Sequence, residues 1–216
     1  MSSSKKMMAI AALAAFVSGT GTASAAVTLF TDSITWLASV SGPTPPITFE
    51  GIAPANSSVF YPTPPGVTLN NVTFGVPHPP ISGQLFIIAP SLNYYPSSVV
   101  SSQGSTSGQN VLTISFPSLV TAAAFNYGGW GTPGDYTVTL SSGDSFLRTA
   151  SWPSLSYVGM TTTTPFNSIT ISSPNDMVNV DNFTLANIVV PEPTSFVMVL
   201  AGLGLLAVNR FRQARR

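Results

Sequence analysis

Apolar and polar residues alternate through much of the middle of the chain, a pattern typical of strands that bury one face. The clearest apolar positions are Leu112, Ile114 and Phe116, followed by Tyr136, Val138 and Leu140. Further short strands are expected at residues 27–30, 47–51, 67–76, 85–89, 120–127, 145–149, 155–159, 166–172 and 178–185. Ser141-Ser142-Gly143-Asp144 has the composition of a hairpin turn. The pattern predicts an all-β body, a β-sandwich of jelly-roll type.

One segment near the start of this body has helical spacing instead. Thr31 or Asp32 can cap a brief helix that Gly42 ends. Its apolar positions are Ile34, Trp36, Leu37 and Val40. We therefore expect one short N-terminal helix, and we expect loops at residues 52–66 and 91–110, which are rich in proline or in Ser, Gly and Asn.

Residues 1–25 read as a secretory signal peptide. Lys5 and Lys6 precede an apolar run over residues 7–17, and Ala23-Ser24-Ala25 matches the small-x-small cleavage pattern. Cleavage by signal peptidase is expected between Ala25 and Ala26, or one residue later. The folded domain is then expected at residues 26–190.

The last 26 residues form a second targeting segment. Pro191-Glu192-Pro193 comes first, and an uncharged, largely apolar run follows over residues 194–209. Four arginines close the chain: Arg210, Arg212, Arg215 and Arg216. Because arginines cross a membrane at high cost, they are expected to stay on the cytoplasmic side of a short transmembrane helix. About 15 helical residues at ~1.5 Å each cover only ~22 Å of a hydrocarbon layer ~30 Å thick, which favours a transient attachment.

This tail resembles the PEP-CTERM sorting domain, which is also catalogued as the ice-binding protein C-terminal domain. The resemblance implies an exported bacterial protein that an exosortase, an integral-membrane enzyme, processes near Pro191-Glu192-Pro193. Residues 47–51, 125–130 and 180–185 also resemble the β-sandwich domains commonly attached to such tails. Ice binding would need a flat, regular threonine array, and residues 161–164 form one short run in an expected loop.

The charge of the body limits its partners. Between residues 26 and 190 the single cation is Arg148, and the net charge is −5 with His78 neutral. The acids are Asp32, Glu50, Asp135, Asp144, Asp176 and Asp181. One cation cannot neutralise a run of phosphates, so nucleic-acid binding is excluded, and a polyanionic polysaccharide is disfavoured. The chain has no cysteine, which removes disulfides and thiolate catalysis.

No catalytic motif stands out, and no catalytic residue is assigned. His78 lies among three prolines in a loop, without a nucleophile motif nearby. A pair of carboxylates, as in glycosidases, is formally available among the six acids. However, Asp135, Asp144 and Asp176 follow turn-forming residues, where short acids commonly serve the turn itself.

Glu50 and Asp181 differ from the other acids because each falls within an expected strand. Val178 and Val180 occupy even positions, whereas Phe183 and Leu185 occupy odd ones. One extra residue is therefore needed to keep them on the same face, which predicts a β-bulge near Asp181-Asn182. First and last strands are often neighbours in a jelly roll, so the two carboxylates could meet. A structural calcium ion bound by both is one hypothesis. The other is that Asp181 accepts hydrogen bonds from backbone amides at the bulge.

Tyr127 and Trp130 flank Gly128-Gly129 in an expected loop. An exposed pair of rings there would form a platform for sugar rings, whereas core packing of Trp130 is the alternative. The leading interpretation is a non-enzymatic exported protein of the cell surface or extracellular polysaccharide matrix. The alternatives are a carbohydrate-binding module and, third, a secreted glycoside hydrolase.

Overall fold

The computed structural model describes residues 27–62, 64–77, 84–90, 95–103, 110–130, 134–151, 154–174 and 176–189. The proposed signal cleavage at Ala25 and Ala26, the motif at residues 191–193 and the four C-terminal arginines therefore lie outside the described residues. So does the C-terminal apolar run. Within the described part, no helix has the length and hydropathy that a membrane crossing requires.

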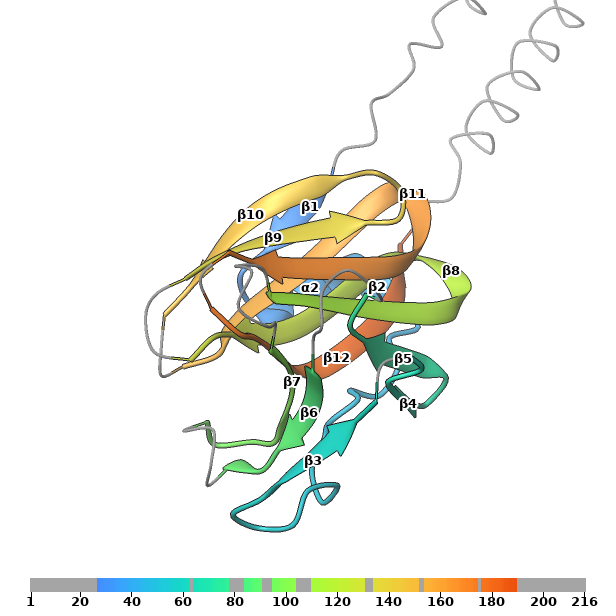
Figure 1. Ribbon diagram of the computed structural model, residues 1–216. Helices are drawn as coiled ribbons and strands as arrows, with labels where there is room; N and C mark the ends of the chain where they lie inside the picture. The colour runs from blue at the N-terminus through green and yellow to red at the C-terminus, as the bar shows by residue number, and fades with distance from the viewer. Residues whose placement is uncertain are drawn as a thin grey trace, which may run out of the picture.

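The described chain is mostly antiparallel β-strand, with one short helix (Figure 1). The elements are β1 (Thr28–Phe30), α2 (Ser33–Ser39), β2 (Val40–Ser41), β3 (Ser58–Tyr61), β4 (Val67–Leu69), β5 (Val72–Gly75), β6 (Gln84–Ile88), β7 (Val99–Gln103), β8 (Asn110–Gly128), β9 (Gly134–Leu140), β10 (Ser145–Ala150), β11 (Ser156–Ser173) and β12 (Val178–Ile188). The main path of hydrogen-bonded strands runs β10-β9-β11-β8-β12-β7-β6-β3, and β1, β2 and the β4–β5 hairpin join it from the side. The predicted all-β sandwich with one short N-terminal helix is confirmed.

The long strands fold over a core rich in phenylalanine. The ring of Phe183 lies 5.8 Å from that of Phe74 and 6.1 Å from that of Phe125, centroid to centroid. Phe49 contacts Phe74 edge to face at 5.1 Å. All of these side chains are fully buried, so residues from β5, β8, β12 and the segment before β3 share one apolar interior. Burial of this apolar area supplies the main favourable term in folding a chain without disulfides.

Two local predictions are confirmed, although the helix ends at Ser39 rather than at Gly42 and Val40 begins β2. Asp32 caps α2, because its Oδ1 accepts a hydrogen bond from the Thr35 amide at 2.9 Å. Trp36 is the buried residue of the helix, and its indole Nε1 donates to the Met160 carbonyl at 3.2 Å. The expected turn at residues 141–144 joins β9 to β10, with the Leu140 amide donating to the Asp144 carbonyl at 2.8 Å.

The expected strand at residues 67–76 is wrong as a single element, because it is a hairpin. Asn70 and Asn71 have φ values of 49° and 64°, as a two-residue primed turn requires. Val67 therefore pairs with Phe74, and both are buried. A single strand would place Thr68, Asn70, Val72, Phe74 and Val76 on one face, but only the last three are buried, because the turn reverses the face that the first strand turns to the core.

Other element boundaries also differ from expectation. The segments expected as loops contain β3 and β7, and four of the five β7 residues are buried. The strand expected at residues 47–51 reduces to one bridge between Ile47 and Phe183, and Glu50 lies in a turn. Residues 161–164, expected as a loop, belong to the long strand β11. Strand β8 continues through Pro117, which is exposed and lies where the pairing of β8 with β11 shifts register. Proline has no backbone N–H, but at this position no hydrogen bond between the strands depends on one.

Candidate functional site

Trp130 lies just after β8 and is 39% exposed. The backbone around it is held from two sides. Its amide donates to Asp176 Oδ1 at 2.7 Å, and the preceding carbonyl of Gly129 accepts a hydrogen bond from the Tyr95 hydroxyl. Tyr95 is only 3% exposed. A large aromatic side chain is thus presented to solvent from a firmly anchored segment.

Asp176 is the anchor, although the sequence suggested only a turn-forming role for it. It is 7% exposed, and its Oδ1 also accepts from the Met177 amide at 2.8 Å. The Tyr136 hydroxyl lies 3.4 Å from its Oδ2. Burial raises the pKa of Tyr136, and the Asp176 charge raises it further, so the phenol stays protonated and can donate. A Cβ at Gly129 would collide with both the Asp176 carboxylate and the Tyr136 hydroxyl, which explains the glycine.

A cavity of about 290 Å³ lies beside Trp130. Residues that contribute to its wall are Ser58, Phe86, Ser101, Gln103, Trp130 and Met177. Strand pairing brings the β-strand members together, because Phe86 of β6 is paired with Ser101 of β7 on one side and with Phe60 of β3 on the other. The wall combines apolar surface with uncharged hydroxyl and amide groups.

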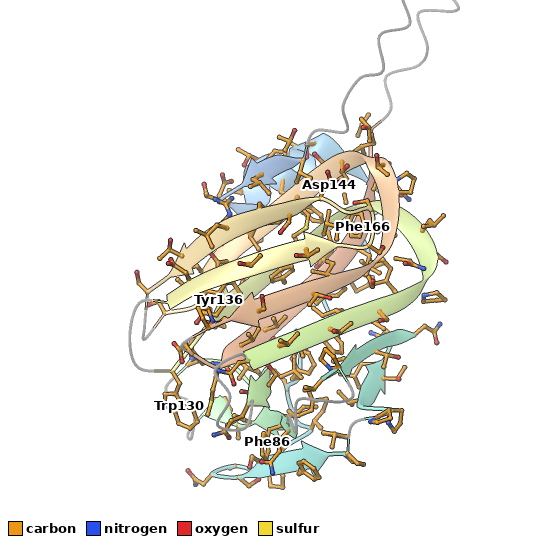
Figure 2. The ribbon with its side chains drawn as sticks, turned by 45° about the horizontal axis from the view of Figure 1, so that its top comes forward. Phe86, Trp130, Tyr136, Asp144 and Phe166 are labelled. Atoms are coloured by element: carbon orange, nitrogen blue, oxygen red, sulfur yellow. The ribbon has the colours of Figure 1, made fainter. Side chains whose placement is uncertain are left out.

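Phe60 extends the aromatic surface away from the cavity. Its side chain is 53% exposed, and its ring centroid lies 5.6 Å from that of Phe86. Figure 2 shows Trp130 and Phe86 at the same end of the molecule, far from Asp144 and Phe166. We call Phe60, Phe86 and Trp130 the aromatic shelf.

The structure corrects the role expected for Tyr127. This side chain is 2% exposed, and its hydroxyl donates to the Thr149 carbonyl at 3.0 Å. Its ring packs edge to face on Tyr136 at 5.4 Å, and burial raises its pKa. Tyr127 shares the inward face of β8 with Phe125, so it belongs to the core and not to a platform with Trp130. Phe86, which the sequence did not single out, lines the same cavity as Trp130.

Glu50 and Asp181 accept hydrogen bonds from two consecutive serines, Glu50 from Ser98 and Asp181 from Ser97. The Ser98 amide donates to Glu50 Oε1 at 2.8 Å, and the Ser98 hydroxyl donates to Oε2 at 3.1 Å. The Ser97 hydroxyl donates to Asp181 Oδ2 at 2.5 Å. These hydrogen bonds tie the segment before β7 to the turn at Glu50 and to β12.

The β-bulge expected near Asp181-Asn182 is confirmed. The pairing of β12 with β8 shifts register between Asp181 and Thr184, and Asn182 has a φ of 53°. The Asn182 amide donates to Asp181 Oδ1 at 2.7 Å, and its side-chain Nδ2 donates to Oδ2 at 3.1 Å. Burial raises the pKa of Asp181 and the nearby Glu50 charge adds to this, whereas the hydrogen bonds from Ser97 and Asn182 oppose it.

The two carboxylates do not form an open acid pair. Asp181 is 1% exposed, so a substrate cannot reach it directly. Over the described residues, no cluster of three or more His, Asp or Glu side chains is placed to hold a metal ion. Of the remaining candidates, Asp144 lies after the β9–β10 turn, Asp135 lies exposed in β9, and His78 is outside the described residues.

Comparisons with known proteins give one family match and a weak structural likeness. Residues 189–216 match the family model described as the PEP-CTERM protein-sorting motif. None of the curated proteins compared matches the chain. Among solved structures, a mutant of a family 29 carbohydrate-binding module is similar over 56% of this chain and 98% of its own, with 14% identity and a TM-score of 0.33. A likeness at that level does not bear on function.

Proposed function

The chain carries a PEP-CTERM protein-sorting motif at residues 189–216, the mark of an exported protein that is sorted through its tail, and we propose that its β-sandwich is a non-enzymatic module that binds carbohydrate. The proposed destination is the cell surface or the extracellular polysaccharide matrix. An exosortase-like enzyme would process the tail near Pro191-Glu192-Pro193 after transient attachment to the membrane.

The aromatic shelf is the observation that carries the binding proposal. Large aromatic side chains gain from leaving water, and an exposed cluster of them commonly marks an interaction site. Here Phe60 and Trp130 are both well exposed, and Phe86 lies beside Phe60 and lines the same cavity as Trp130. The flat C–H faces of a sugar ring are apolar and suit such rings.

The polar groups beside the shelf favour a neutral ligand with hydroxyl groups. Ser58 and Gln103 are exposed and contribute uncharged donors and acceptors to the cavity wall. An apolar surface with a few polar groups that fix orientation is the usual composition of a small-ligand site. The net charge of −5 over residues 26–190 repels acidic polymers, so neutral glycans are the proposed class.

The anchoring of Trp130 supports the same proposal. Asp176 and Tyr95 hold the backbone on both sides of the Gly129–Trp130 peptide. A ring that is already in position loses little conformational freedom when a ligand stacks on it, which improves affinity. The buried position of Asp181 disfavours glycosidase chemistry by Glu50 and Asp181.

The test is binding of the mature protein to the neutral exopolysaccharide of its host and to a panel of neutral glucans, galactans and mannans, measured by affinity electrophoresis and calorimetry. Trp130→Ala and Phe86→Ala should each weaken binding by roughly tenfold or more, as expected for aromatic hot spots. Leu147→Ala is the matched control, because Leu147 is 62% exposed on β10 and does not line the cavity. It should bind as the parent does.

Equal binding by the parent, Trp130→Ala and Phe86→Ala would exclude the aromatic shelf as the site. Absence of binding to every neutral glycan in the panel would overturn the proposed ligand class. Melting temperatures of the variants separate a lost contact from a lost fold.

A further inference from the structure

A second, larger cavity lies elsewhere on the sandwich, beside helix α2. Its volume is about 440 Å³, and it shares no lining residue with the cavity at Trp130. Its floor is formed by side chains of three neighbouring strands, β11, β8 and β12. Its rim includes Leu37 of α2 and Pro43 and Pro46 of the following segment. We call it the Tyr157 cavity.

Strand pairing explains how its polar residues come together. Tyr157 of β11 is paired with Asn126 of β8, and Asn126 is paired on its other side with Asp181 of β12. The bulge then places Asn182 next in line, with a φ of 53°. Tyr157, Asn126 and Asn182 all line the cavity, so an aromatic ring and two amides occupy adjacent strands.

The neighbouring residues leave room above this row. Gly159 and Ala124 are paired across β11 and β8, and Ala124 lines the cavity. Trp36 of α2 packs so closely over Gly159 that a Cβ there would collide with the indole ring. Helix α2 therefore packs over the Gly159–Ala124 pair. Beside that pair, Tyr157, Asn126 and Asn182 line the cavity.

Tyr157 gives a second, independent sign of a ligand. Its hydroxyl is buried, yet it has no hydrogen-bond partner within the described part of the chain. Burial raises the pKa of Tyr157 to about 12, and the charge of Asp32 raises it as well, so the group stays protonated and can donate. Most buried polar atoms in proteins are satisfied, and an exception calls for an explanation.

The lining also defines the chemistry of the ligand. No charged side chain is among the lining residues of the described chain. Two amides, the tyrosine hydroxyl and the hydroxyls of Thr44 and Thr184 can donate and accept at several points. Leu37, Pro43 and Pro46 give the opposite wall an apolar character. This combination suits an uncharged molecule with several hydroxyl groups and an apolar face.

We propose that the Tyr157 cavity is a second binding site, separate from the aromatic shelf, that takes a neutral sugar unit through Asn126, Asn182 and Tyr157. The two sites together would let one molecule contact two glycan chains, which goes beyond the single surface of the proposed function. The Tyr157 cavity is built independently, so it does not require binding at Trp130.

The experiment uses isotope-labelled mature protein titrated with glucose, galactose, mannose, N-acetylglucosamine and their neutral disaccharides. At least one of these should produce saturable shifts in the side-chain amide resonances of Asn126 and Asn182. Tyr157→Phe removes only the hydroxyl and should weaken that binding roughly threefold to tenfold, the loss expected for one neutral hydrogen bond. Asn126→Ala should weaken it at least as much.

Trp130→Ala separates the two sites, because it should leave the shifts of Asn126 and Asn182 unchanged. If Trp130→Ala abolishes those shifts, the cavity is not a separate site and the inference fails. It also fails if no probe shifts the two amides saturably, or if Tyr157→Phe binds as tightly as the parent. Retained melting temperatures in Tyr157→Phe ensure that this variant stays informative even if Asn126→Ala does not fold.

Discussion

The amide of Trp130 donates a hydrogen bond of 2.7 Å to the carboxylate of Asp176, a residue 46 positions further along the chain. This contact joins the segment after β8 to the segment before β12 and holds the backbone of Trp130, the largest side chain of the aromatic shelf. Asp176 itself is nearly buried and also accepts from Met177. The same carboxylate therefore serves the fold and the proposed binding surface.

Removing the Asp176 carboxylate should lower both the stability of the fold and the affinity for glycan. Asp176→Ala leaves the amides of Trp130 and Met177 without their acceptor, and we expect the free energy of unfolding to fall by about 2 kcal/mol. Binding of neutral glycan should weaken as well, because Trp130 loses its fixed position. Urea unfolding and calorimetry measure the two effects. Asp135→Ala is the control, since Asp135 is exposed in β9, and it should change stability by less than about 0.5 kcal/mol. Unchanged stability of Asp176→Ala would contradict the anchoring role.

Asp181 should make stability depend on pH. Burial raises its pKa in the folded state above the ordinary value of 3.8, with the Glu50 charge adding to the effect. The folded state then favours the protonated form of Asp181. The stability that this protonation adds is fully present below the pKa of the unfolded chain, and it is lost as the pH rises through the pKa of the folded state.

Asp181→Asn keeps an oxygen acceptor for the Asn182 amide and removes the charge. We expect this variant to melt at a higher temperature than the parent at pH 7, and the difference should shrink as the pH is lowered toward 3.8. Thermal melts across the acid range measure it. A difference that instead grows on acidification would show that the charged carboxylate stabilises the fold.

The calcium hypothesis for Glu50 and Asp181 is tested separately. Hydrogen-bond donors from Ser97, Ser98 and Asn182 already reach all four carboxylate oxygens. We therefore expect chelator and added calcium to leave the melting temperature unchanged. A drop in chelator that is absent from Asp181→Asn would instead establish a structural ion held by this pair.

Processing should remove both ends of the chain. Mass spectrometry of the mature protein from a host with an exosortase should find an N-terminus at Ala26 or Val27 and a C-terminus close to Pro193. Replacing residues 191–193 with alanine should leave uncut protein in the membrane, because the processing enzyme loses its motif. A mature product that still carries residues 211–216 would show that the tail acts as a lasting anchor.

Local sequence signals predicted several features well. Asp32 before the helix and the Ser-Ser-Gly-Asp turn are short-range patterns, and both elements form as expected. The parity change before Phe183 located the β-bulge, because alternation reports directly on which side a strand residue faces.

Non-local pairing accounts for what the sequence missed. The segment of β7 is rich in serine, which is typical of a loop, yet it forms a strand because β6 and β12 pair with it on both sides. The Asn70-Asn71 turn had a local signal, because the apolar positions change from Val67 and Leu69 to Val72 and Phe74, but a prediction of one strand over residues 67–76 ignores that change. The buried role of Asp176 depends on Trp130 and Tyr136, which are distant in sequence.

The sequence by itself determined the class of the fold, the C-terminal sorting motif and a net negative charge of the body that disfavours acidic ligands, because these follow from composition and short-range order. The tertiary structure alone decided that Tyr127 is core, that Phe86 and Trp130 line one cavity, and that Tyr157 lines another cavity with two amides. Alternation tells which residues share a face of a strand. Whether that face is covered or open depends on which distant strands and loops pack against it.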